Sequence, residues 1–568
     1  MGKVFDYTVP DAMDADVRVG TVVRIELHGR RVGGWVVDDE REPPARVQKL
    51  KPIAKVTGWG PPPSLVDLSS WATWRWAGPR AAFLGTASAD VAVRGLPRPP
   101  SSPPPATVVV DPEVAAAIDD SLRAGGGIVR LPPEVDVASI AAHVVAVRGP
   151  SLILSPNHVD ASRIALALKR QGTPVASLPR DWPAARAGGL SVVGSRAAAW
   201  APVPDPAAIL VLDAHDEAYQ EERTPSWHAV DVAIERAKRA RIPIVLTSPC
   251  PDLIMLAAAR RPPRTLSRRD ERDGWPMLDV IDRRGDDPRT GMYSERLVNL
   301  VRRAERSLLV LNRKGRARLL ACGACSELAR CERCEAAVAQ SDDGLACGRC
   351  GLVRPGLCAS CGSTALKALR VGVTRVREEL EALLQAPVGE VTGDTDDVPD
   401  TDVIIGTEAV LHRVPRCDLV AFLDIDQELL APRYRAAEEA LALLARAGRL
   451  VGGRRGGGRV AVQTRLPHHE VLAAALHGDP ARVTDVELPK RELLGFPPAK
   501  AMAAVSGAAA EAYVDRLRAA SIPNIEVLGP GDGRWLVRAP SAATLADALS
   551  QIDRPPGRLR LEVDPRRL

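Results

Sequence analysis

Short apolar runs alternate with helix-like stretches in the middle of this chain. The runs lie at residues 107–110, 151–154, 190–193, 208–212 and 242–247, with a helical pattern between them, for example at residues 161–171. Such alternation is typical of a parallel, doubly wound sheet. We therefore expect a first α/β lobe at residues 107–265.

The same alternation returns later and predicts a second lobe, which starts at residues 266–320 and continues at residues 365–470. Strands are expected at 367–371, 402–405, 419–424 and 460–464, and helices at 374–384 and 435–444. Residues 392–401 are acidic and predict a solvated loop. Residues 446–459 hold five arginines among six glycines, which fits either a disordered loop or a contact with phosphates.

Both ends of the chain have patterns of their own. At residues 1–97, expected strands at 4–10, 17–27 and 31–37 and a helix at 64–76 indicate a β-rich domain. Trp71 and Trp74 share one face of that helix, where packing in a core is favoured over stacking on bases. The Pro/Ser-rich linker 98–106 follows. Residues 471–568 predict a compact α+β domain without a catalytic motif, with strands at 501–506, 526–528, 535–538 and 558–563 and helices at 509–520 and 542–552.

Eight of the ten cysteines lie within residues 321–364 as four Cys-x-x-Cys pairs. One pair supplies half of a tetrahedral zinc site, so four pairs predict two closed four-cysteine zinc sites with no open position for catalysis. A disulfide cluster or free thiols are the alternatives, and disulfides favour secreted proteins. The pairs are Cys322/Cys325, Cys331/Cys334, Cys347/Cys350 and Cys358/Cys361, and their spacing alone does not say which pairs share a metal.

Composition adds a few limits. The length of 568 residues predicts several domains, and with only 3% aromatic residues their cores must consist of Ala, Val and Leu. A net charge of +5 does not establish nucleic-acid binding, although clustered cations can act locally. Arg313, Lys314 and Arg316, just before the cysteines, are candidates for phosphate contact. Without a signal core or a long apolar run, we expect a soluble cytoplasmic protein with no membrane contact.

The apolar run 208–212 ends in Asp213, the position at which P-loop NTPases hold magnesium. Such enzymes also need a Gly-x-x-x-x-Gly-Lys-Ser/Thr loop to hold the phosphates. The candidate at residues 124–133 reads AGGGIVRLPP, which lacks the Lys-Ser/Thr pair, and Pro132 and Pro133 remove two N–H donors. We therefore expect the fold without its nucleotide chemistry.

Several short motifs, in order, resemble the PriA family of bacterial primosomal proteins, which restart stalled replication forks. The cysteine block with its lead-in at residues 311–315 is the most specific match. Shorter matches are FDY at 5–7, GSR at 194–196, WHAVD at 227–231, GTE at 406–408, LDID at 423–426, YRAAE at 434–438, QT at 463–464, FPP at 496–498, VLGP at 527–530 and VDP at 563–565.

The resemblance implies a fold and a set of site residues. It implies an N-terminal domain that binds DNA 3′ ends, two helicase-like lobes with the two-zinc module inserted in the second, and a C-terminal DNA-binding domain. It places Asp6 and Gly34 where the family holds the terminal nucleotide. It also implies that Cys322, Cys325, Cys358 and Cys361 share one zinc and that Cys331, Cys334, Cys347 and Cys350 share the other.

The chain departs from the family at four ATPase motifs. Pro-containing residues replace the phosphate loop, and Asp213-Ala214-His215-Asp216 replaces Asp-Glu-Glu-His. Residues 247–250 read TSPC in place of Gly-Ser-Ala-Thr, and residues 445–449 read ARAGR in place of the arginine motif. The segment before the first lobe is also short for the family's winged-helix domain. These losses predict a subgroup without helicase activity, since loss of one charge-stabilising element of phosphoryl transfer costs roughly 10³ in rate.

Three functions remain open at this point. The preferred one is a non-enzymatic, nucleoid-associated factor of the replication-restart primosome. It would recognise abandoned forks and DNA 3′ ends and help reload the replicative helicase, together with single-stranded-DNA-binding protein and helicase-loading proteins. The alternatives are an active ATP-dependent 3′–5′ helicase with unusual nucleotide contacts, and a zinc-ribbon protein of another DNA or RNA machine.

Overall fold

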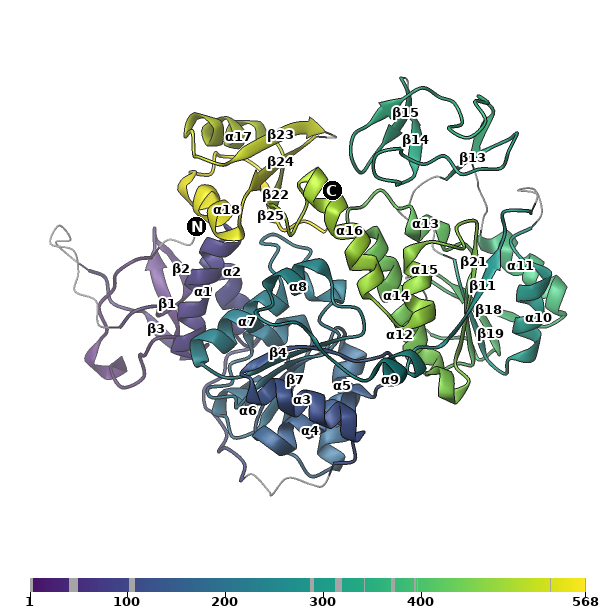
Figure 1. Ribbon diagram of the computed structural model, residues 1–568. Coiled ribbons are helices and arrows are strands. Elements are labelled where there is room, and N and C mark those ends of the chain that lie inside the picture. Colours follow the sequence, from purple (N-terminus) through teal and green to yellow (C-terminus); the bar gives the residue numbers. More distant parts are fainter. Residues whose placement is uncertain are drawn as a thin grey trace.

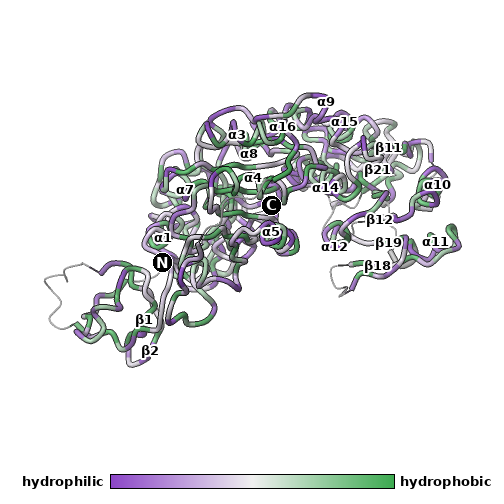
Figure 2. The backbone as a smooth tube through the Cα atoms, turned by 90° about the horizontal axis from the view of Figure 1, so that it is seen from below, coloured by the Kyte–Doolittle hydropathy of each residue, from purple (hydrophilic) through white to green (hydrophobic). Residues whose placement is uncertain are grey.

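The computed structural model describes residues 4–39, 50–101, 108–286, 291–311, 319–341, 343–368, 373–392, 395, 397–531 and 533–566. Two α/β lobes lie next to each other, and the cysteine-rich module lies beside the second lobe (Figure 1). Seen from below, the N-terminal sheet lies at one end of an elongated molecule and the strands of the second lobe lie at the other (Figure 2).

The N-terminal domain contains an antiparallel sheet and a helix pair. The sheet has the order β2-β1-β3, and its elements are β1 (Val22–Leu27), β2 (Arg30–Trp35) and β3 (Lys55–Gly58), followed by α1 (Pro63–Arg75) and α2 (Arg80–Ala87). The strand expected at residues 4–10 is wrong, because this segment makes only an isolated bridge between Thr8 and Pro52. Proline has no N–H to extend a ladder there.

The two tryptophans of α1 are half-buried, and both contact other side chains of the protein. The Trp71 ring meets Trp76 edge-on at 5.2 Å between centroids, and Trp74 Nε1 donates to Asp547 Oδ1 of the C-terminal domain at 2.8 Å. One cluster of buried apolar side chains contains residues of α1, of the first lobe and of the C-terminal domain. These three parts therefore share a core.

The first lobe contains a seven-stranded parallel sheet of order β10-β4-β9-β8-β5-β7-β6. Its strands are β4 (Gly126–Arg130), β5 (Leu152–Leu154), β6 (Val175–Ser177), β7 (Ser191–Gly194), β8 (Ile209–Val211), β9 (Ile244–Ser248) and β10 (Arg264–Thr265). Its helices are α3 (Pro112–Arg123), α4 (Val137–Arg148), α5 (His158–Arg170), α6 (Trp182–Ala187), α7 (Ala229–Ala240), α8 (Leu253–Ala258) and α9 (Arg268–Asp273).

The glycine-rich run of this lobe is a strand, β4, and not the loop that the sequence indicated. A Cβ at Gly126 would lie 2.2 Å from the backbone oxygen of Ile244 on β9, and its φ of +110° also requires glycine. The connection that follows β4 and leads to α4 is residues 131–136. The strand expected at 107–110 is wrong for residues 108–110, which are irregular.

The second lobe contains a six-stranded parallel sheet of order β11-β21-β20-β12-β19-β18. Its strands are β11 (Met277–Asp282), β12 (Ser307–Val310), β18 (Val388–Val391), β19 (Val403–Gly406), β20 (Leu419–Phe422) and β21 (Arg459–Thr464). Its helices are α10 (Glu295–Arg303), α11 (Val373–Leu384), α12 (Val410–Arg413), α13 (Asp426–Leu429), α14 (Ala436–Val451) and α15 (Glu470–His477), and α16 (Ala481–Leu494) leads on to the C-terminal domain.

Two expectations for this lobe are corrected. The strand expected at 367–371 belongs in part to the cysteine-rich module, where β17 (Leu366–Ala368) pairs antiparallel with β13 (Leu320–Cys322); residues 369–371 lie outside the described part. The Arg/Gly run 446–459 is ordered, because α14 continues to Val451 and a 3-10 turn follows at Arg454–Gly456.

The remaining elements belong to the two smaller units. The module also contains a three-stranded antiparallel sheet of β14 (Val338–Ser341), β15 (Gly344–Cys347) and β16 (Val353–Arg354). The C-terminal domain is an antiparallel sheet of order β23-β24-β22-β25 with two helices. Its elements are β22 (Ala501–Ser506), α17 (Ala510–Ala519), β23 (Glu526–Gly531), β24 (Arg534–Ala539), α18 (Ala542–Gln551) and β25 (Arg560–Val563).

Candidate metal centre and interlobe cleft

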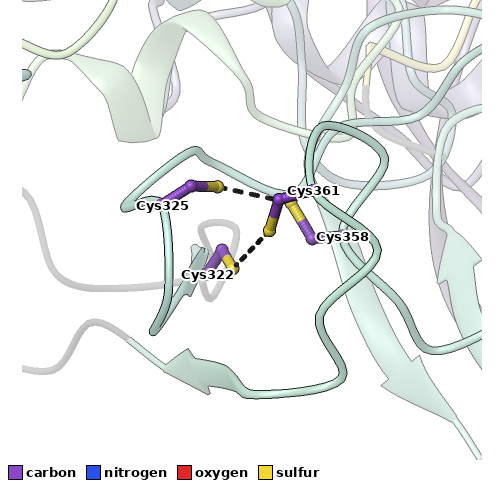
Figure 3. A group of neighbouring side chains, drawn as sticks. All are labelled: Cys322, Cys325, Cys358 and Cys361. Atoms are coloured by element: carbon purple, nitrogen blue, oxygen red, sulfur yellow. Dashed lines mark hydrogen bonds between the residues drawn. The ribbon is translucent and has the colours of Figure 1, made fainter.

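The eight clustered cysteines form two groups of four. One group is Cys322, Cys325, Cys358 and Cys361, whose side chains point toward one another in Figure 3, and the other is Cys331, Cys334, Cys347 and Cys350. Within each group all four Sγ atoms lie within 4.8 Å of one another. The closest Sγ–Sγ pairs are 3.5 to 3.6 Å apart, whereas a disulfide requires about 2.05 Å.

This geometry fits zinc. A tetrahedral site with Zn–S bonds of about 2.3 Å places its sulfur atoms about 3.8 Å apart, close to the separations found here. The donor set of four thiolates is the one used in structural zinc sites, and it leaves no position for water or substrate. Two zinc ions per chain would therefore join segments of the module that are distant in sequence and stabilise its folded form.

All four Cys-x-x-Cys turns have the same backbone. In each turn, the residue after the second cysteine donates its N–H to the carbonyl of the first, at 2.9 to 3.0 Å. That residue is left-handed in every case, with φ between 62° and 74°: Ser326, Glu335, Gly351 and Gly362. Backbone N–H groups also point at the sulfur of the first cysteine, and they lower the pKa of Cys322 to about 6, which favours the thiolate that a metal binds.

The module is fixed to the second lobe and to α16. Ala337 donates its N–H to the carbonyl of Leu430 at 2.8 Å, beside α13. Arg349 makes a 2.8 Å ion pair with Glu487 of α16, and both side chains are buried. The cations Arg313, Lys314 and Arg316, which the sequence suggested as phosphate contacts, lie outside the described residues.

The two candidate 3′-end contacts both lie in the N-terminal domain. Asp6 is half-buried and follows the exposed Phe5, close to the bridge at Thr8. Gly34 lies on β2 opposite Val23 of β1. A Cβ at Gly34 would meet nothing within 4 Å, so there is open space beside this strand.

A cleft between the two lobes contains Asp213 at the end of β8. Residues of both lobes line it, together with Arg566 near the C-terminus; those that take part in the contacts below are Asp213, Asp252, Arg435, Glu438, Arg446 and Arg449. Arginines of the second lobe and carboxylates of the first lobe face each other here. The cleft is therefore the place where a nucleotide would lie in a two-lobed motor.

Two arginines of α14 cross this cleft to carboxylates of the first lobe. Arg449 Nη2 lies 2.5 Å from Asp213 Oδ1, and its Nη1 donates to the carbonyl of Val135 at 3.1 Å. Arg446 pairs with Asp160, in the first turn of α5, at 3.2 Å. Burial opposes ionisation of Asp160, but the Arg446 charge keeps the pKa of that carboxyl below its ordinary value.

A third ion pair between the two lobes lies at the start of α14. Arg435 pairs with Asp252 at 2.5 Å with both side chains buried. Burial alone would raise the pKa of Asp252, yet Arg435 lowers it to about 2. Glu438 accepts from the N–H of Leu253 at 2.8 Å and pairs with the buried Arg491 of α16 at 2.6 Å.

The connection between β4 and α4 has no free helix N-terminus. The carboxylate of Asp136 accepts from the N–H groups of Ala138 and Ser139, at 3.3 and 3.0 Å. These first amides of a helix are the groups that bind phosphate in nucleotide sites. A side chain of the chain itself already accepts their hydrogen bonds here.

Sequence reasoning missed Asp136, Asp160 and Asp252 as parts of this cleft. Asp136 was detectable, because an Asp directly before a helical apolar run is a typical N-cap. The partners of the arginines were not detectable, since Asp160 and Asp252 are more than 180 residues away from them along the chain.

Comparisons with known proteins agree with this architecture. The family model described as 3'DNA-binding domain (3'BD) matches residues 1–88. The probable replication restart protein PriA of Mycobacterium bovis is 30% identical over 611 aligned positions, which cover 96% of this chain and 92% of the relative. The chain belongs to the PriA replication restart protein family. It is thus a PriA-family protein with a 3′-DNA-binding domain, two parallel-sheet lobes and two four-cysteine clusters.

Other PriA proteins match over smaller shares. The replication restart protein PriA of Haemophilus influenzae is 26% identical over 79% of this chain and 67% of the relative. For the Bacillus subtilis protein the identity is 27%, over 60% of this chain and 47% of the relative. A DEAD box protein structure from Methanococcus jannaschii aligns with 65% of this chain and 90% of its own at 12% identity, with a TM-score of only 0.31, which carries no further weight. Among the helices described, none has the length and apolar character needed to cross a bilayer.

Proposed function

We propose that this chain recognises stalled or abandoned replication forks through their DNA 3′ ends and helps reload the replicative helicase, without unwinding DNA itself. It would act in the cytoplasm on nucleoid DNA. Its partners would be single-stranded-DNA-binding protein and helicase-loading proteins of the primosome. The two-zinc module would be a rigid surface for contacts with protein or DNA.

The observation that carries this proposal is the internal pairing of the interlobe cleft. A nucleotide motor needs free helix amides for phosphate and free arginines for the γ-phosphate. Here Asp136 accepts from the amides of α4, and Arg446 and Arg449 pair with carboxylates of the first lobe. A triphosphate would have to displace these contacts and would meet further negative charge.

Loss of the standard residues at the same place supports this view. Residues 131–136 read LPPEVD, so the connection after β4 offers no lysine and no hydroxyl. Pro132 and Pro133 have no N–H. Glu134 adds a carboxyl whose pKa is raised by burial. Four altered motifs in one cleft therefore favour a scaffold that keeps its lobes together by ion pairs over one that cycles with ATP.

The direct test is ATP hydrolysis by the purified full chain with forked DNA, after its zinc content has been measured. We expect two zinc ions per chain, fork binding above that of a blunt duplex of equal length, and no DNA-stimulated phosphate release. Equal affinity for fork and duplex would contradict the DNA-recognition part. DNA-stimulated hydrolysis that is lost in Asp213→Ala would contradict the other part and favour an active 3′–5′ helicase.

A further inference from the structure

Trp59 differs from the other tryptophans of this protein. All ten tryptophans lie in the described part of the chain, and nine of them are buried or half-buried. Trp59 is 46% exposed, at the end of β3 in the N-terminal domain. Its indole therefore presents a large aromatic surface to solvent, where it contributes little to the core.

The first lobe supports this ring from one side. The guanidinium carbon of Arg186, on α6, lies 5.3 Å from the centre of the Trp59 ring. Arg186 Nε also donates to the carbonyl of Gly60 at 3.2 Å. The ring orientation is thus fixed by a cation–π contact between two parts of the molecule. A fixed, exposed aromatic ring with an attached cation is suited to stacking on a base next to a phosphate.

The sheet register places Trp59 close to Gly34. Val23 of β1 pairs with Gly34 on one side and with Val56 on the other, and the next residue, Val22, pairs with Gly58 after a bulge. Trp59 therefore lies two strands away from Gly34 and about two residues along, a separation of about 12 Å. A stacked strand covers this distance in about three to four nucleotides, and an extended strand needs fewer.

Two cations lie close to Trp59. Arg186 lies against its ring, and the exposed Arg94 follows Val93, which bridges to Trp59. Arg24 and Lys55 pair in the row of Gly33, one residue away from the row of Gly34, so their side chains lie on the other face of the sheet. Arg186 and Arg94 are therefore the cations placed to contact phosphates beside a base on Trp59.

We propose that Trp59, supported by Arg186, stacks on an unpaired base a few nucleotides before the 3′ end of the bound DNA strand. This inference rests on the proposed 3′-end recognition and extends it: the protein would read an unpaired 3′ tail of several nucleotides and not the terminal nucleotide alone. The ligand class is single-stranded DNA that leads to a free 3′ end.

The test is an abasic scan on the full chain. Short single strands with a 5′ dye and a free 3′-hydroxyl carry one abasic site at each of the last six positions in turn, and binding is measured by fluorescence anisotropy. We expect one or two positions, near the third or fourth from the end, at which loss of the base weakens binding roughly ten-fold. Trp59→Ala should bind the intact strand roughly ten-fold more weakly than wild type does. An abasic site at the same positions should weaken the binding of this variant no further.

Matched variants separate stacking from folding. Trp59→Phe keeps an aromatic ring and should retain most of the position dependence, while Arg186→Ala should weaken it. Trp535→Ala is the control, because Arg518 lies 4.8 Å from the centre of that ring in the same kind of contact but in the C-terminal domain. The Trp535 variant should keep the wild-type scan. Zinc content and thermal unfolding show that each variant is folded.

The outcomes distinguish this inference from the function on which it rests. Wild-type preference for a 3′-hydroxyl over a 3′-phosphate reports 3′-end recognition. Suppose that preference is present, but the abasic site weakens binding equally at all positions, or the position dependence is the same in Trp59→Ala as in wild type. The proposed stacking site is then wrong, while recognition of the 3′ end is retained. If the preference is absent in wild type, end recognition itself fails.

Discussion

At the residue scale, two of the four zinc turns carry an energetic cost that the other two avoid. The position after the second cysteine is left-handed in all four, and glycine fills it in two, at Gly351 and Gly362. Ser326 and Glu335 have side chains there, which cost roughly 1 kcal/mol each in this conformation. Zinc binding outweighs this cost, because a structural zinc ion contributes about 10 kcal/mol or more. The turns therefore tolerate both kinds of residue.

The grouping of cysteines makes a prediction about metal content. Cys350→Ser should reduce zinc from two ions to one per chain, because a hydroxyl is a poor substitute for thiolate in a closed site. The measurement is zinc per chain by elemental analysis after gel filtration. Cys417→Ser is the control, since burial raises the pKa of the Cys417 thiol to about 12 and it lies outside both clusters. Loss of zinc in the control, or two ions retained in Cys350→Ser, would contradict the grouping.

Two neighbouring carboxyls of the second lobe, the buried Asp426 and the half-buried Asp424, predict a pH dependence. Burial, and then the nearby charge of Asp424, raise the pKa of Asp426 to about 7. A carboxyl with a raised pKa binds its proton more tightly in the folded state than in the unfolded state, where its pKa is about 3.9. The free energy of unfolding should therefore fall as the pH rises from about 4 to 7 and then level off.

Replacing Asp424 by Asn tests this coupling. Asp424→Asn removes the like charge, so the pKa of Asp426 should move down, and it also removes a carboxyl whose own pKa is raised by burial. Both changes should make the fall in stability between pH 5 and 8 smaller. Urea unfolding at the two pH values measures it. Asp515→Asn, at a side chain that is 67% exposed, should leave the difference as in wild type. An unchanged slope in Asp424→Asn would show that the two carboxyls do not interact.

At the element scale, the packing of α14 between the lobes depends on a glycine. A Cβ at Gly448 would lie 2.9 Å from Cδ of Pro276 and 3.2 Å from Cβ of Pro133. Prolines are rigid, so these neighbours cannot move aside easily. This glycine lets the helix that carries Arg446 and Arg449 approach the connection after β4.

Gly448→Ala is therefore predicted to destabilise the protein, although alanine normally stabilises a helix interior by about 1 kcal/mol over glycine. We expect a net loss of about 1–2 kcal/mol, as for other overpacked sites. Denaturant unfolding measures it, and hydrogen exchange at residues 131–136 should increase. Gly456→Ala, where a Cβ would meet nothing within 4 Å, should change little. A more stable Gly448→Ala would mean that the lobes are free to separate.

Helices and strands were predictable where the apolar pattern repeats. They were less predictable where a contact with a residue distant in sequence determines the backbone conformation. The strands β5, β7, β8 and β9 could be predicted because each is a short apolar run between polar helices. The glycine-rich β4 could not, since its conformation depends on the close approach of Ile244. Likewise the Cys-x-x-Cys spacing predicted two metal sites but not which pairs share a metal. The family resemblance implied that grouping, and the structure has it, with Cys322 next to Cys361.

At the scale of the whole molecule, four residues near the C-terminus join three parts of the chain. Asp564 pairs with Arg75 of α1 at 2.5 Å. The carbonyl of Val563 accepts from Ser226 of the first lobe at 3.2 Å, and that of Pro565 accepts from Tyr434 of the second lobe at 3.1 Å. Arg566 donates to His228 at 2.7 Å. This segment therefore helps to set how the N-terminal 3′-DNA-binding domain and the two lobes sit together.

Asp564→Ala is predicted to loosen this arrangement. Arg75 is mostly buried, and among the described carboxylates it would retain Asp231, at 3.6 Å. Loss of one partner of a buried ion pair costs about 3–5 kcal/mol, and the remaining contact with Asp231 should reduce this to about 2 kcal/mol. Denaturant unfolding measures the loss. A protease should also cleave the N-terminal domain from the rest of the chain faster, because its helix α1 loses a contact with the C-terminal segment.

The control is Glu562→Ala, two residues earlier on β25. Glu562 pairs with Arg560, a half-exposed residue of the same strand, at 3.2 Å, and surface pairs contribute at most about 1 kcal/mol. It should unfold and be cleaved almost as wild type does. Equal effects of the two substitutions would mean that β25 matters only as a strand, and that residues 563–566 do not join the parts. A large effect of Asp564→Ala alone would mean that the placement of the N-terminal 3′-DNA-binding domain depends on this segment.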